Sequence, residues 1–119
     1  MRIFLMSFAF LTSLSIVAVS CGDDSTAYDC TGLTPTYSGN VKAIFDTNCA
    51  SAGCHGNGSA EAGVDLSTYS GAKSASLDGE VLCSIEHGNG CEAMPQGGTQ
   101  LDDATIKIVA CWIENGAPN

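Results

Sequence analysis

Basic residues are scarce in this sequence. Its 119 residues include four Lys and Arg against 13 Asp and Glu, for a formal net charge of −9. After residue 20 only Lys42, Lys73 and Lys107 remain, so residues 21–119 carry 3 minus 13, or −10. A nucleic acid backbone attracts the opposite charge, so we expect no nucleic acid partner. An acidic surface favours solubility, and it can also steer a basic partner protein.

Regular strands and long apolar segments are missing as well. No segment alternates between apolar and polar residues for long enough to predict a β-strand, and there are no internal repeats. A membrane-spanning helix needs roughly 20 strongly apolar residues. The longest apolar run, residues 3–19, follows Arg2 and is broken by Ser7, Thr12, Ser13 and Ser15. This pattern favours a signal peptide at residues 1–20 over a membrane span.

The end of that segment predicts how the mature protein begins. Residues 18–21, "AVSC", resemble the lipobox of bacterial lipoproteins, although Ala18 stands where leucine is most usual. Ala18 and Ser20 would also suit an ordinary signal peptidase. We expect cleavage after Ser20 and a lipid on Cys21 that attaches the protein to a membrane. The protein would then be exported, at the periplasmic face of a bacterial membrane or at the cell surface, with residues 21–36 as an acidic tether and residues 37–119 as one domain.

The number of cysteines is odd, and an exported protein meets an oxidising compartment in which thiols tend to pair. One cysteine must therefore be used differently, and a lipid on Cys21 would account for it. The six that remain allow three disulfides, or two disulfides with two cysteines bound elsewhere. The seven are Cys21, Cys30, Cys49, Cys54, Cys83, Cys91 and Cys111.

If Cys49 and Cys54 are used elsewhere, the four cysteines that are left, Cys30, Cys83, Cys91 and Cys111, allow three disulfide connectivities. We favour Cys83–Cys91, because residues 87–90, "HGNG", allow the chain to turn back between them. Cys30–Cys111 is then the second pair, and it would tie the start of the domain to its last helix. An alternative is a zinc site formed by Cys83, His87 and Cys91, which lie at positions i, i+4 and i+8.

The hydrophobic pattern predicts an all-α domain that is small and rich in loops. Apolar residues recur at helical spacing in the segments 36–49, 66–77, 78–88 and 101–119. The expected N-caps are Ser38 in the first segment, Ser67 or Thr68 in the second, and Asp102 or Asp103 in the last. Residues 91–100 have no period and contain Pro95 and two glycines, which predicts a loop.

Two motifs carry candidate chemistry. The stretch "NCASAGCHGNG" contains Cys49 and Cys54 with four residues between them, and His55 directly follows the second cysteine. A c-type haem is bound by thioether bonds to two cysteines, and the adjacent histidine reaches the iron. Met94, which is the only methionine outside the signal segment, lies in the 91–100 loop and could fill the sixth iron position. His87 is an alternative sixth ligand, and a local Cys49–Cys54 disulfide is the alternative to haem attachment.

The order of these motifs along the chain resembles that of a known family. Cys54-His55-Gly56, "GEVLCSIEHG" at 79–88, Met94-Pro95 and "WIENGAP" at 112–118 resemble the single-haem cytochrome c domains of bacterial exported proteins, over roughly Tyr37 to Pro118. The family usually has two residues between its cysteines, whereas this chain has four, all of them small, at residues 50–53.

The resemblance implies a cytochrome c-like helical fold wrapped around one haem c, with the first and last helices packed together and one haem edge exposed. Cys49 and Cys54 would bind the haem covalently, with His55 as the proximal and Met94 as the distal iron ligand. The implied function is electron transfer to and from redox partner proteins, without enzymatic activity and without a small-molecule substrate.

Two other functions remain open at this point. The first is a haem-free lipoprotein, stapled by disulfides, that acts as a binding or structural module. The second keeps the haem but uses a labile bond to Met94 for sensing or for an enzymatic role.

Overall fold

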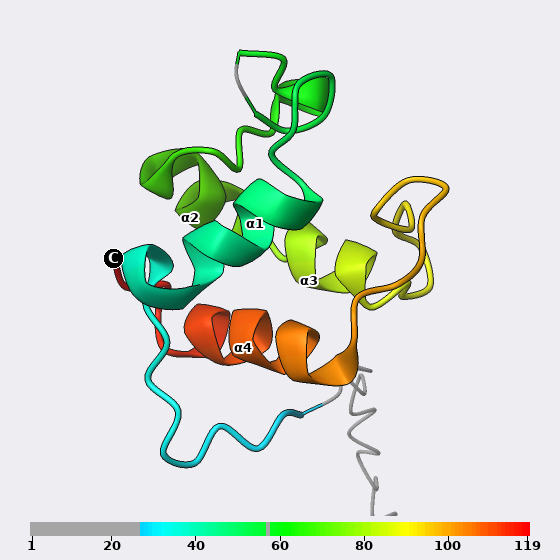
Figure 1. Ribbon diagram of the computed structural model, residues 1–119. Coiled ribbons are helices and arrows are strands. Elements are labelled where there is room, and N and C mark those ends of the chain that lie inside the picture. Colours follow the sequence, from blue (N-terminus) through cyan, green and yellow to red (C-terminus); the bar gives the residue numbers. More distant parts are fainter. Residues whose placement is uncertain (1–26, 57) are drawn as a thin grey trace, which may run out of the picture.

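The computed structural model describes residues 27–119 except residue 57, and these residues form a set of short helices joined by loops (Figure 1). The elements in chain order are a π-helical turn η1 (Tyr37–Val41), α1 (Lys42–Asn48), a 3-10 turn η2 (Glu61–Gly63), α2 (Tyr69–Leu77), α3 (Glu80–Ile85) and α4 (Asp103–Glu114). Within the described residues there is no strand, and an isolated β-bridge pairs Ala52 with Gly56. The predicted all-α fold class is therefore confirmed.

None of the helices in the described part of the chain is long and apolar enough to cross a membrane. The predicted signal peptide at residues 1–20 and the predicted lipid site at Cys21 lie outside the described residues, so both stay predictions.

Polar side chains cap η1, α2 and α4, and the sequence indicated the capping residue for α2 and α4. Thr68 accepts a hydrogen bond from the Gly71 N–H at the start of α2, and Asp102 accepts one from the Thr105 N–H at the start of α4. The expected Ser38 N-cap is wrong, because Thr36 has the extended backbone of an N-cap residue and its hydroxyl accepts from the Gly39 N–H at 3.0 Å. The first helical segment therefore begins at Tyr37, with a π-helical turn ahead of α1.

Aromatic side chains join the two ends of the domain. Trp112 on α4 is fully buried and meets the Phe45 ring of α1 edge-on, with ring centroids 6.2 Å apart. Tyr37 lies 6.1 Å from Trp112 and 5.5 Å from Tyr69, so rings from η1, α1, α2 and α4 form one cluster. The Trp112 indole N–H donates to the Pro118 carbonyl at 2.7 Å, which satisfies its polar atom in the core. This cluster places α1 across α4 (Figure 1).

Two disulfides close loops of very different length. Cys30–Cys111 has a sequence separation of 81 and Cys83–Cys91 a separation of 8, which is the pairing that the sequence favoured. The alternative zinc site at Cys83, His87 and Cys91 is wrong, because both of its sulfurs are bonded to each other. No group of three or more His, Cys, Asp or Glu side chains in the described ranges 27–56 and 58–119 is arranged to hold a metal ion.

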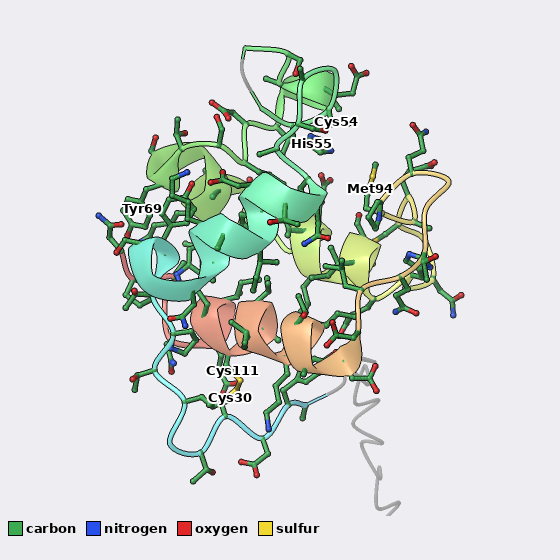
Figure 2. The ribbon with its side chains drawn as sticks, viewed as in Figure 1. Cys30, Cys54, His55, Tyr69, Met94 and Cys111 are labelled. Carbon is green, nitrogen blue, oxygen red and sulfur yellow. A yellow bond between two sulfur atoms is a disulfide. The ribbon has the colours of Figure 1, made fainter. Side chains whose placement is uncertain are left out.

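Residues 27–36, the part of the predicted tether that the structure describes, are attached to the domain at Tyr28 and Cys30. The Cys30–Cys111 disulfide attaches this segment to α4 (Figure 2). The Tyr28 hydroxyl donates to a Glu86 carboxylate oxygen at 2.6 Å, just beyond α3. The segment thus contacts α4 and the residue that follows α3 before η1 begins.

Removing the two disulfides is expected to destabilise the fold unequally. In the chain-entropy model the Cys30→Ala/Cys111→Ala variant loses about 4 to 5 kcal/mol, whereas Cys83→Ala/Cys91→Ala loses about 2.5 kcal/mol, because the closed loops differ in length. Urea unfolding of both variants and of the unchanged protein, all in the same cofactor state, measures these differences. Equal losses, or a larger loss for the short loop, would contradict the expectation.

Candidate functional site

The end of α1 delivers the first residue of the Cys-Cys-His motif. Cys49 is the C-cap of α1, and its N–H donates to the Phe45 carbonyl at 2.8 Å. Phe45 packs on Trp112, so the position of Cys49 follows from the core contact one helical turn earlier.

The four residues between the cysteines form a closed turn. The Cys54 N–H donates to the Ser51 carbonyl at 3.0 Å, and the His55 N–H donates to the Cys49 carbonyl at 3.1 Å. The second bond brings His55 back beside Cys49. Gly53 has a φ of +84°, a left-handed conformation that glycine adopts without strain and that reverses the chain here. The longer spacing is therefore accommodated within the turn.

Glycine is required at position 56 by a close backbone approach. A Cβ atom there would collide with the carbonyl group of Ala50, on the other side of the turn. The short distance between these two backbone segments lets Gly56 pair with Ala52 in the isolated bridge.

The His55 side chain is oriented by one hydrogen bond. Its Nδ1 lies 3.1 Å from the Val64 carbonyl, which can only accept, so Nδ1 carries the hydrogen and donates it. The lone pair is then on Nε2, where a metal ion could bind. The Leu66 N–H donates to the His55 carbonyl at 2.7 Å, and the Tyr37 hydroxyl donates to the Leu66 carbonyl, which connects the histidine to the core.

Met94 approaches from a different part of the chain. It lies in the loop between α3 and α4, and its N–H donates to the Ser84 carbonyl at 3.0 Å. Figure 2 shows Met94 and His55 extending from separate loops on the same side of the molecule. His87 is exposed, and its Nε2 lies 3.1 Å from the Met94 carbonyl. Because that carbonyl accepts, Nε2 donates in this arrangement, and the lone pair of the neutral ring is then on Nδ1.

A cavity of about 490 Å³ joins the two loops. This volume falls within the roughly 300 to 1,000 Å³ typical of cofactor and ligand sites. Cys49, Cys54, His55 and Met94 all line it, whereas His87 does not. Its apolar wall consists of Val64, Leu66, Val81, Ile85 and Pro95.

Cys49 and Cys54 are free thiols, so the alternative local disulfide between them is not formed. The third cysteine of the cavity lining, Cys91, is paired with Cys83. Cys54 is exposed and Cys49 is half-buried. Burial, and to a smaller extent the charge of Cys54, raises the pKa of the Cys49 thiol to about 11. Cys49 is therefore a protonated thiol at neutral pH.

The charged side chains of the cavity lining are carboxylates. Glu61, Glu80 and Glu92 are exposed residues of this lining, and no lysine belongs to it. The negative charge predicted from the composition is thus present at the edge of the cavity.

The backbone groups that orient the candidate ligands could not be predicted from the sequence. Val64 and Ser84 act through backbone carbonyls, which leave no signal in residue type. The His87 ring, the alternative iron ligand, contacts the backbone of Met94, and no signal in the sequence indicated this contact.

A family model described as cytochrome C oxidase, cbb3-type, subunit III matches residues 39–113, well over half of the chain. The chain belongs to this family of c-type cytochrome domains. Comparisons with curated proteins and with solved structures found no match. The matched residues of this cytochrome c domain include Cys49, Cys54, His55 and Met94.

Proteins of this family in general bind haem and transfer electrons. The residues of the cavity fit a haem. It offers two free thiols for thioether bonds, an imidazole Nε2 and a thioether sulfur from separate loops, and an apolar wall. The two disulfides alone would also suit the haem-free alternative. The family match is what favours the cytochrome.

Substituting Gly56 is expected to damage the site. A Gly56→Ala variant must push the backbone of Ala50 away, which should cost about 1 to 3 kcal/mol of unfolding free energy and lower the yield of haem-containing protein. Ser51→Ala, an exposed position in the same turn, is a matched control that should change stability by less than about 0.5 kcal/mol. Urea unfolding and a haem stain measure both effects, and a Gly56→Ala variant equal to the control would contradict the close approach.

Proposed function

We propose that this cytochrome c domain is an exported, lipid-anchored electron carrier with a single haem c, attached to Cys49 and Cys54, and with His55 and Met94 as axial ligands. The observation that carries the proposal is that these four side chains, from two loops far apart in the sequence, line one cavity. The haem iron, when bound, supplies a one-electron couple, and a methionine ligand favours its reduced state.

The residues around the cavity would support that role in distinct ways. The Val64 carbonyl accepts the Nδ1–H of His55, which orients the ring and leaves Nε2 for the metal. Val81 and Ile85 of α3 are buried members of the apolar wall, which limits access of water. With His55 and Met94 both coordinating, no iron position would be open for oxygen or peroxide chemistry.

Partner recognition would use the acidic edge of the cavity. Glu61, Glu80 and Glu92 give this surface a negative charge, which attracts a redox protein with a basic docking face. The predicted signal peptide and the lipid on Cys21 would place that encounter at the periplasmic face of a bacterial membrane or at the cell surface.

A haem stain tests the cofactor directly. After expression with a cytochrome c maturation system, the band on a denaturing gel should stain for haem, because thioether bonds survive denaturation. The Cys49→Ala/Cys54→Ala variant should lose the stain. Cys83→Ala/Cys91→Ala, which removes an equal number of cysteines, should keep it. An unstained band, with Cys49 and Cys54 found as a disulfide by mass spectrometry, would sink the proposal.

Membrane attachment is tested at Cys21. The unchanged protein should sediment with membranes and release only with detergent, since several acyl chains bind a bilayer firmly. A Cys21→Ser variant should appear in the soluble exported fraction or keep its signal peptide. Soluble behaviour of the unchanged protein would show that cleavage leaves no lipid.

A further inference from the structure

The backbone of Met94 is held at both of its polar groups. Its N–H donates to the Ser84 carbonyl at 3.0 Å, and its carbonyl accepts from the His87 ring at 3.1 Å. Ser84 belongs to α3, and His87 follows that helix by two residues. The methionine is therefore connected to the end of α3 by a backbone contact and by one side chain.

His87 has a left-handed backbone conformation, which glycine adopts more readily than histidine. Its φ of +55° is left-handed, a region that glycine enters freely and that a residue with a Cβ enters at a cost in free energy. The neighbouring left-handed positions 79, 90 and 97 are all glycine. A histidine at position 87 thus keeps an unfavourable backbone, and what it provides that glycine lacks is the ring that contacts Met94.

The turn that carries His87 is closed covalently. The Cys83–Cys91 disulfide joins the residues on either side of it, and the Gly88 N–H donates to the Cys83 carbonyl at 2.8 Å. The imidazole is thereby placed relative to α3 by the turn itself. Its position does not require the loop of Met94 to be ordered first.

We propose that His87 is a positioning residue that holds the Met94 backbone through its ring N–H, so that the Met94 sulfur is set in place at the cavity. This rests on the proposed function, since it requires Met94 to bind the haem iron. Loss of the ring should let Met94 leave the iron more readily, without loss of the haem or of the fold.

Imidazole titration of the oxidised, haem-containing protein measures this directly, because imidazole competes with Met94 for the iron. The readout is loss of the methionine–iron charge-transfer band at the red edge of the visible spectrum. Losing one hydrogen bond should raise the apparent imidazole affinity about three- to tenfold in both His87→Ala and His87→Gly. The two variants differ in backbone freedom and share the missing ring. Ala60→Gly, a left-handed position in the other loop, is the matched control and should bind imidazole as the unchanged protein does.

The outcomes separate this inference from the proposed function. Raised affinity in both His87 variants, with an unchanged haem stain, supports the positioning role. Unchanged affinity in both, or a rise in His87→Gly alone, overturns it, since the ring would then be dispensable. If His87→Ala does not accumulate, His87→Gly compared with Ala60→Gly decides. Two results would show that Met94 is not an iron ligand, and the proposed ligation would then fail instead. The first is that the unchanged protein lacks the methionine–iron band. The second is that the Met94→Ala variant binds imidazole no more tightly than the unchanged protein.

Discussion

The packing of Phe45 on Trp112 is the contact on which the site depends. It sets α1 across α4, and Cys49 follows Phe45 by one turn of helix, so a shift of α1 would move the first cysteine and the turn after it. Trp112 is held in turn by its hydrogen bond to Pro118, and Cys111 beside it is tied to Cys30. Cys30, near the start of the described residues, and Pro118, near their end, are thus both joined to α4. In a domain this small the apolar core is modest, and such covalent and aromatic connections contribute much of the stability.

The two sides of the cavity are held by different means. On the cysteine side, short backbone hydrogen bonds close the turn at residues 50–54, and the Val64 and Leu66 backbone fixes His55. On the methionine side there is little regular structure, and a disulfide, a backbone contact to α3 and the His87 ring take its place. A loop that must keep one side chain in position without packing into a core needs such fixed points, because its backbone would otherwise retain its conformational entropy.

The four-residue spacing between the cysteines does not separate His55 from Cys49. Residues 50–53 form a turn whose ends are joined by the hydrogen bond from His55 to Cys49. Of these four residues Gly53, which has no side chain, lines the cavity. The cysteine and the histidine can therefore serve one cofactor despite the longer spacing. The cavity is also distinguished by its negative charge. Its lining includes exposed glutamates and no lysine.

Local signals in the sequence determined the helical class and the motif with its adjacent histidine, because each depends on residues within one or two turns of each other. They also placed two helix caps to within one residue, at Ser67 or Thr68 and at Asp102 or Asp103, and the structure selects Thr68 and Asp102. The chemistry of the cysteine and methionine positions was also readable, since few residue types can bind haem. Only the tertiary structure decided that Thr36 rather than Ser38 starts the first helix, that the Val64 carbonyl orients His55, and that the His87 ring meets Met94. These outcomes depend on backbone groups and on the path of loops. Backbone carbonyls are the same in every residue, so no pattern of side chains could have identified them.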